Sequence, residues 1–174
     1  KNQLLTTVAY KIGNKKMYCY EGGIFVAGSA IQWLRDKLLM FKDSTETNSL
    51  YLKADKNEKL TVIPSLTGLG APYWQPNIRG AIFGLTRNTS IPEIIKSTID
   101  SISFQTFDLI EAMEKDSKTK IKELRVDGGM IGNDNFIQSL ANILQINILK
   151  PSNIETTSLG VAYLAALNSG SIKN

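Results

Sequence analysis

Hydrophobic and polar positions follow a strand pattern near the start of the chain and then a helical one. β-branched and aromatic residues dominate Leu4–Tyr10 and Lys16–Tyr20, with the sequence Ile-Gly-Asn-Lys between them. Because Asn and Gly tolerate the positive φ angles of tight turns, this pattern predicts a β-hairpin. From Ile24 to about Phe41 the apolar residues recur at helical spacing, which predicts an amphipathic helix.

The middle of the chain predicts a polar surface segment, two short strands and a structured loop. Residues 42–59 are rich in Asp, Ser, Thr, Asn and Lys, and we expect only a short helix there, near Ser49–Lys53. Leu60–Ile63 and Ala81–Leu85 are short apolar runs that favour strands. Between them, Thr67–Gly80 gathers Gly and Pro around two adjacent aromatic residues, which indicates a structured loop rather than a flexible linker.

The second half of the chain alternates helices and strands. Ser90 and Glu93 stand at the spacing of a capping box, and the helix that they start extends to about Ser117. The later apolar patterns predict a strand, a helix, a strand and a helix, at Ile121–Val126, Asn133–Leu144, Ile146–Leu149 and Ser158–Asn168. Strands followed by alternating helix and strand favour one α/β layered domain, which we expect to cover residues 1–174.

Composition and charge narrow the classes of function. The chain has 174 residues, enough for one domain with a sizeable core, and a mild net charge of +4. Its basic residues are dispersed rather than gathered with aromatics, which argues against nucleic-acid binding. No apolar stretch approaches the roughly 20 residues that span a bilayer, and there is no secretory signal. The sequence begins with Lys1 rather than Met, so we expect it to start inside a larger protein.

The rare residue types exclude several kinds of chemistry. Cys19 is the only cysteine, so we expect a reducing, cytoplasmic setting and a buried structural thiol. The chain has no histidine, which removes imidazole catalysis and most transition-metal sites. There is no Walker P-loop, metal-ligand cluster, serine-hydrolase elbow or paired-carboxylate spacing. These patterns give no candidate catalytic or metal-ligating residue.

Two glycine-rich corners are candidate binding sites. Gly128 and Gly129 stand between a predicted strand and a predicted helix, where the backbone can approach a bulky ligand and helix amides can face it. A nucleotide suits such a corner, and a tight turn without a ligand is the alternative. Gly28 and Gln32 are four positions apart, so they share a helix face. Glycine inside a helix costs about 1 kcal/mol relative to Ala, a cost that close approach of a ligand or of another helix offsets.

The aromatic residues of the 67–80 loop permit two interpretations. Tyr73, Trp74 and Arg79 either form a cradle for a ligand or lie in a loop that its own aromatic side chains hold in place. We favour the second interpretation.

Four ordered motifs resemble the FGGY family of carbohydrate kinases. Residues 68–87, which begin Gly-Leu-Gly-Ala-Pro-Tyr-Trp, closely resemble the signature of the glycerol kinases within that family. The motifs at 21–36, 124–130 and 155–163 are similar to the same group, and the resemblance is collinear from about Leu4 to Asn168. The first string also favours glycerol kinases over the xylulose and gluconate kinases of the family.

The resemblance implies a fold, a nucleotide and a set of contacts. It implies an α/β, RNase H-like fold of the actin/Hsp70/hexokinase type, with a mixed sheet, flanking helices and a second domain that closes with it on ATP, Mg²⁺ and glycerol. In the family the C-terminal domain carries the adenosine pocket. Gly28 and Gln32 match nucleotide-contacting helix positions. Gly129 matches the glycine whose backbone faces the nucleotide, and Asn133 matches the adenine-contacting asparagine.

Several parts of the family's catalytic machinery have no counterpart in this sequence. The phosphate loop, the glycerol-binding residues, the Asp-Gln catalytic segment and the Mg²⁺ ligands are missing, and the resemblance places them on an N-terminal kinase domain. We therefore expect the ATP-binding, C-terminal part of an enzyme that transfers the γ-phosphate of ATP to glycerol, giving sn-glycerol 3-phosphate. Since phosphoryl transfer depends on positioning and an oriented base, we expect this chain alone to be inactive.

Two alternatives remain open at the level of sequence. The chain could be a non-catalytic remnant or split-gene product that binds nucleotide or a partner, and exposed apolar surface would then favour homo-oligomers. It could also be a domain of a related polyol or sugar kinase. Four positions depart from the family's usual residues, as drift in a remnant would produce: Gln75, Asn88, Gly132 and Asn135. The first two affect the geometry of their loops, and Asn135 replaces a frequent large apolar residue.

Overall fold

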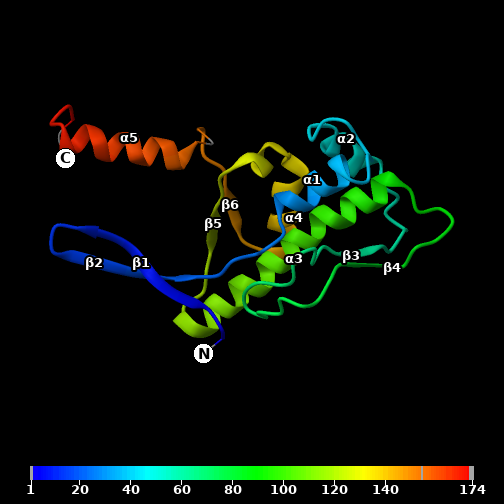
Figure 1. Cartoon of the computed structure of the whole chain (residues 1–174), viewed down its shortest axis with the longest axis horizontal. Coiled ribbons are helices and arrows are strands. Elements are labelled where there is room, and N and C mark those ends of the chain that lie inside the picture. The colour runs from blue at the N-terminus through cyan, green and yellow to red at the C-terminus, as the bar shows by residue number, and fades with distance from the viewer. Residues whose placement is uncertain (1, 154, 173–174) are drawn as a thin grey trace.

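Most helices of the chain pack together, whereas its strands form three separate two-stranded sheets within the described residues (Figure 1). A computed structural model describes residues 2–153 and 155–172. In chain order the elements are β1 (Leu5–Ile12), β2 (Lys15–Glu21), α1 (Gly28–Asp36), α2 (Glu46–Lys53), β3 (Thr61–Ile63), β4 (Ala81–Phe83), α3 (Ile91–Ser117), β5 (Glu123–Arg125), the 3-10 helix η1 (Gly129–Gly132), α4 (Asp134–Leu144), β6 (Asn147–Leu149) and α5 (Thr156–Asn168). Every helix in the described ranges is too short or too polar to cross a lipid bilayer.

Helix α3 is the longest element, with 27 residues, and lies at the centre of the packed helices. The predicted capping box starts it: the backbone N–H and the hydroxyl of Ser90 donate to Glu93 Oε2, at 2.8 and 2.5 Å. Pro92 stands in the first turn, where its missing N–H costs no intrahelical bond. The helix ends at Lys118, whose φ of 59° is left-handed. Both predicted ends of this helix are confirmed.

The hydrophobic core lies where α1, α2 and α4 pack against α3. On α3, Ile95, Ile99 and Ile102 follow one another at helical spacing and form a continuous buried stripe. The other buried members of the core are Ile31, Leu34, Phe41, Phe136, Leu140 and Leu144. The short antiparallel sheet of β3 and β4 packs beside α3. We call residues 24–117 and 129–144, which contain these elements and η1, the helical body.

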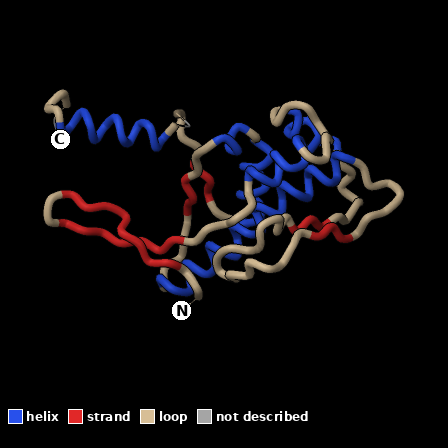
Figure 2. Tube along the Cα trace, viewed as in Figure 1, coloured by secondary structure: helices blue, strands red, loops and turns tan. Residues whose placement is uncertain are grey.

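The β1–β2 hairpin and α5 extend away from the helical body, toward the same side of the view in Figure 2. Every residue of β2 is exposed, as is every residue of β1 except Thr7, and α5 has no buried residue. The hairpin is antiparallel, as predicted, with an irregularity between Val8 and Tyr10. We call residues 5–21 and 156–168 the exposed arms.

A strand–helix–strand unit, whose helix α4 belongs to the helical body, leads to α5. β5 and β6 pair in parallel, from Glu123 opposite Asn147 to Arg125 opposite Leu149. η1 and α4 form the crossover that a parallel pair requires. The chain thus has both the parallel and the antiparallel pairs of the expected mixed sheet. In the described residues they lie in separate two-stranded sheets.

The predicted helix from Ile24 to Phe41 is wrong at both ends, because α1 covers only Gly28–Asp36. Before it, the carbonyl of Gly23 accepts a hydrogen bond from the N–H of Ala71 at 3.0 Å, which commits that backbone to the neighbouring loop. After it, Leu39 has a left-handed φ of 53°. Phe41 still belongs to the core. The helical spacing of apolar residues therefore arises here from a helix and the two loops that flank it.

The expectation of a buried Cys19 is also wrong, because the thiol is exposed. Cys19 lies on β2 opposite Thr7 of β1, in a hairpin that no second layer covers within the described residues. A period of two tells which residues share a face of a strand. It does not tell whether another element packs on that face.

Candidate functional site

One cavity of about 510 Å³ collects the four predicted site residues, Gly28, Gln32, Gly129 and Asn133. They come from two segments that are far apart in the sequence: α1, and the stretch from η1 to the residue that precedes α4. The volume falls in the range of about 300–1,000 Å³ that is typical of small-molecule sites. The structure therefore brings together all four residues that the sequence singled out.

Helix α1 forms one wall of the cavity. Gly28 is its first residue, and a Cβ atom there would lie 3.4 Å from Met130 Cγ and 3.5 Å from Met130 Sδ. These are ordinary van der Waals distances, so the contact with η1 does not by itself require glycine, and because Gly28 is the first residue of α1 it does not lie inside the helix as the sequence suggested. Gln32 lies one turn later and is exposed on the cavity side. α1 has no side-chain cap and no acidic residue in its first turn, so its positive end is uncompensated there.

Of the two adjacent glycines, Gly129 lines the cavity and Gly128 precedes it. Gly128 has a φ of 88°, which L side chains rarely adopt, so this position needs glycine for its backbone. Gly129 is different: a Cβ atom there would meet nothing within 4 Å. Its backbone faces open space in the cavity, where a ligand can approach. The glycines lead into the short helix η1 before α4 begins, rather than directly into the predicted long helix.

Asn133 is the N-cap of α4. Its Oδ1 accepts hydrogen bonds from the backbone N–H groups of Asn135 and Phe136, at 3.0 and 3.1 Å. Its Nδ2 donates to the hydroxyl of Thr47 at 3.0 Å. An asparagine amide has two N–H donors, so one N–H of Asn133 is left for a ligand.

Residues 44–48 form a third wall that sequence reasoning missed, since we expected this stretch to be a surface segment. Two acidic side chains order it. The carboxylate of Asp43 accepts from the N–H and hydroxyl of Thr45, at 2.8 and 2.6 Å, which lowers the Asp43 pKa. Glu46 Oε1 accepts from the N–H groups of Lys42 and Asp43, at 3.0 and 2.8 Å. The spacing of Asp43 and Glu46 could have located the start of α2, but no sequence signal places it beside the cavity.

Arg35 adds a cationic side chain to the cavity and was also missed. It lies three residues after Gln32, on the same side of α1. Its Nε and Nη2 donate to the two carboxylate oxygens of Asp36, at 2.6 and 3.1 Å, and this contact lowers the pKa of Asp36. The pairing reduces the net charge offered to a ligand. Among the described residues, no group of three or more Asp, Glu or Cys side chains is placed to hold a metal ion.

The aromatic loop at 67–80 does not line this cavity. Tyr73 donates its hydroxyl proton to Asp108 at 2.8 Å, and Trp74 Nε1 donates to the carbonyl of Gln3 at 2.5 Å. The rings of Phe25 and Trp74 meet edge to face, with their centroids 6.0 Å apart. The aromatic side chains hold the loop in place, as we had favoured.

Comparison with known proteins identifies the family. Residues 2–169 match the C-terminal domain of the FGGY family of carbohydrate kinases. The chain belongs to the FGGY family. The glycerol kinase of Streptococcus gordonii is 50% identical over 170 residues, which cover 98% of this chain and 34% of that protein. The glycerol kinase of Bradyrhizobium diazoefficiens is also 50% identical, over 173 residues that cover 98% of this chain and 35% of that protein.

Solved structures agree with this assignment. The crystal structure of Plasmodium falciparum glycerol kinase with ADP matches with a TM-score of 0.86 and 32% identity, over 98% of this chain and 34% of that one. A xylulose kinase from Lactobacillus acidophilus has a TM-score of 0.79 at 24% identity, over 99% of this FGGY chain and 34% of that one, which shows the fold alone. The predicted α/β, RNase H-like fold is confirmed. The chain spans about a third of the length of the curated relatives that it matches.

Proposed function

We propose that this chain is the nucleotide-binding, C-terminal part of a glycerol kinase, which transfers the γ-phosphate of ATP to glycerol to give sn-glycerol 3-phosphate. One observation carries the proposal: Gly28, Gln32, Gly129 and Asn133 converge on one cavity. The similarity to glycerol kinases, one of them solved with ADP, supports the choice of ligand and of substrate.

The chemistry of the cavity suits a purine nucleoside, which has apolar faces and polar edges. Met130 and Phe136 offer apolar surface, and the amide of Gln32 and the remaining N–H of Asn133 offer hydrogen bonds. The open space beside Gly129 leaves room for the ligand at the backbone. These residues bind and orient the nucleotide, and we assign them no covalent or proton-transfer step.

We propose that the catalytic groups lie in the part of the relatives' sequence that this chain does not span. Phosphoryl transfer needs an acceptor held in line, a residue that orients it and, when bound, Mg²⁺ to neutralise the phosphate charge. The described residues contain no cluster that could hold the metal. We therefore propose an N-terminal kinase domain as the partner of this chain, and expect no turnover without it.

The exposed arms are the proposed contact with that partner. Large apolar side chains on both arms are between 40% and 66% exposed, namely Leu5, Val8, Tyr10, Ile12, Met17, Tyr18, Tyr20, Leu159, Val161, Tyr163 and Leu164. Apolar patches of this kind mark protein–protein contacts. Left uncovered, they favour association between copies of the chain.

Nucleotide titration of the 174-residue chain tests the proposal. We expect ADP to bind with a Kd of about 0.1–1 mM, because the phosphate-side contacts lie elsewhere. The NMR shifts should concentrate at Gly28, Gln32, Gly129 and Asn133. Shifts confined to other parts of the chain would contradict the proposed site. Rapid glycerol phosphorylation by this chain alone would contradict the proposal that the catalytic groups lie on an N-terminal domain.

A pair of glycine substitutions sharpens the test. Gly129→Ala places a methyl group in the cavity without a clash inside the protein, so we expect a folded chain with weaker ADP binding. Gly160→Ala is the matched control, because a Cβ atom there also meets nothing within 4 Å but lies on α5. Equal ADP affinity in the two variants would count against the cavity as the nucleotide site.

A further inference from the structure

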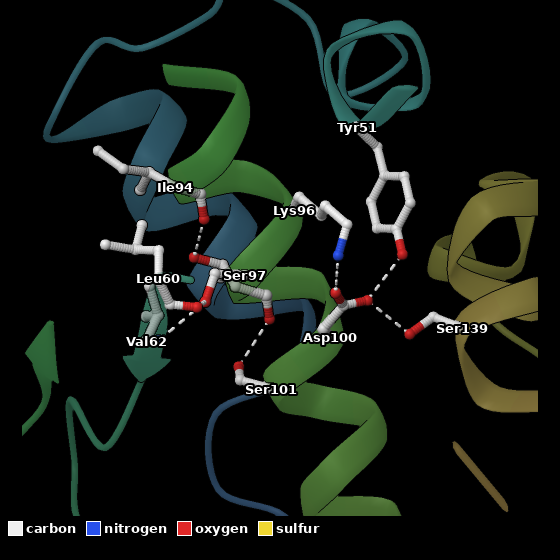
Figure 3. A network of polar contacts seen from close by, with 10 residues as sticks. Tyr51, Leu60, Val62, Ile94, Lys96, Ser97, Asp100, Ser101 and Ser139 are labelled. Atoms are coloured by element: carbon white, nitrogen blue, oxygen red, sulfur yellow. Dashed lines mark hydrogen bonds and ion pairs between the residues drawn. The ribbon is translucent and has the colours of Figure 1, made fainter. Parts of the chain in front are cut away.

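Asp100 joins three helices through one carboxylate (Figure 3). Its Oδ1 accepts from the hydroxyl of Tyr51 on α2, at 2.8 Å, and from the hydroxyl of Ser139 on α4, at 2.7 Å. Its Oδ2 accepts from Lys96 Nζ on α3 at 2.6 Å. The Lys96 ammonium also lies 5.3 Å from the centre of the Tyr51 ring. Burial and the neighbouring carboxylate raise the pKa of Tyr51 still further above neutral pH, where the hydroxyl is already protonated and donates.

The same face of α2 continues toward the cavity through further polar contacts. Thr47, one turn before Tyr51, accepts from Asn133 Nδ2, as described above. The carbonyl of Asn48 accepts from Asn135 Nδ2 at 3.0 Å, and the two side-chain amides also contact each other. Positions 47, 48 and 51 lie on one side of a helix. We call the polar contacts of Thr47, Asn48 and Tyr51 the polar seam. The seam holds α2 against α3 and α4, and its N-terminal end continues into the cavity wall at 44–48.

Apolar burial does little to hold α2. Thr47 is its only buried residue, and Leu52 is 71% exposed. Leu50 and Tyr51 reach the core only as partly buried neighbours. Because the hydrophobic contribution scales with the apolar area removed from water, the hydrogen bonds of the seam decide where α2 sits. Asp100 is the charged member among them, and hydrogen bonds to charged groups are the stronger ones.

We propose that Asp100 is a positioning residue for the nucleotide cavity: by holding Tyr51 and Ser139 together it fixes α2, and so places residues 44–48 where they line the cavity. The inference rests on the proposed function, since it concerns the wall of the same site. Asp100 itself does not line the cavity.

Substitution of Asp100, with Ser97 as the matched control, tests the inference in the full chain. Asp100→Ala removes the shared acceptor, so α2 occupies its binding-competent position less often and the Kd for ADP should rise by about tenfold. Ser97→Ala removes two hydrogen bonds of the same helix, to the carbonyl of Leu60 and from the N–H of Val62, but these lead to β3. It should lower thermal stability while changing the Kd by less than about twofold.

Two milder variants separate positioning from general destabilisation. Asp100→Asn keeps an oxygen that accepts from Tyr51 and Ser139, so it should recover most of the ADP affinity that Asp100→Ala loses. Tyr51→Phe removes only the hydroxyl on α2, and should raise the Kd with little change in melting temperature. If the Kd in these variants and in Ser97→Ala simply follows the loss of stability, the positioning role is refuted.

Hydrogen exchange keeps the inference testable if the unaltered chain binds no ADP, a result that would refute the proposed function. Asp100→Ala should then speed amide exchange at 44–53 selectively, whereas Ser97→Ala should not. Exchange that rises equally throughout the helical body, or that does not change at 44–53, would overturn the positioning role.

Discussion

The helical body and the exposed arms contain similar kinds of apolar residue but bury them to opposite extents. Leu34 on α1 has no exposed surface, whereas Leu164 on α5 is 61% exposed. α5 is the more apolar of the two helices, and residues 156–168 contain no charged side chain. The difference is therefore not in the segments themselves. Burial requires a second surface, which α3 supplies to α1 and which no described residue supplies to α5.

The pattern of α5 indicates what kind of environment it is suited to. A helix with one apolar stripe covers a core from outside, whereas a helix that is apolar on all sides is typically buried on all sides. The apolar residues of α5 are spread around its circumference. For this reason we propose that the surface that covers α5 belongs to the part of the relatives that this chain does not span.

The largest expected effect comes from truncating a leucine in each region. Leu34→Ala removes a fully buried side chain and should lower the free energy of unfolding by about 3–4 kcal/mol. Leu164→Ala, the same change on an exposed arm, should alter it by less than about 0.5 kcal/mol. Denaturant titration measures both values. Similar losses would show that α5 packs against the helical body in solution.

Acid titration tests the start of α3 within the helical body. Hydrogen bonds from the Ser90 hydroxyl, and then from the backbone N–H groups of Asp55 and Ser90, lower the pKa of Glu93 from 4.5 to about 2. Because the folded pKa is depressed, this stabilisation is present above about pH 4.5 and is lost as the pH falls through about 2. Glu93→Gln should therefore lose on the order of 2 kcal/mol at neutral pH. The stability of this variant should converge with that of the parent near pH 2, the folded pKa of Glu93. An equal difference in stability at all pH values would contradict the role given to the Glu93 carboxylate.

Self-association should depend on the arms and not on the helical body. Replacing Leu159 and Tyr163, which lie four residues apart on α5, with Lys should weaken association by about tenfold without lowering the unfolding midpoint. Leu52→Lys is the control, because Leu52 is a leucine of α2, outside the arms, that is 71% exposed. Analytical ultracentrifugation of the parent and the variants distinguishes them. A parent chain that is monomeric at high concentration would remove the basis for this prediction.

The smallest expected effect on stability is at Cys19. Its thiol is exposed on β2, so Cys19→Ser should change the free energy of unfolding by less than about 0.5 kcal/mol. In the native parent the thiol should react fully with a thiol reagent under non-denaturing conditions. Protection of the thiol in the native state would show that another surface covers the hairpin.

Local patterns in the sequence were sufficient for most elements of the fold. The capping box of Ser90 and Glu93 placed α3, and the later apolar runs placed β5, α4, β6 and α5 to within two residues. Each of these signals depends on neighbours in the chain, namely caps, turns and periodicity. The four candidate residues that line the cavity were likewise singled out in the sequence, partly from glycines next to helices and partly from resemblance to the FGGY family.

Contacts between distant segments decided the rest. The backbone of Gly23 bonds to Ala71, so α1 starts later than its apolar spacing suggests. Residues 44–48 became a cavity wall because Thr47 meets Asn133 and Tyr51 meets Asp100, pairings across 86 and 49 positions. Cys19 was exposed for the converse reason, since no described element packs on its strand. Periodicity fixes which side chains share a face, and only the packed structure determines what, if anything, lies against that face.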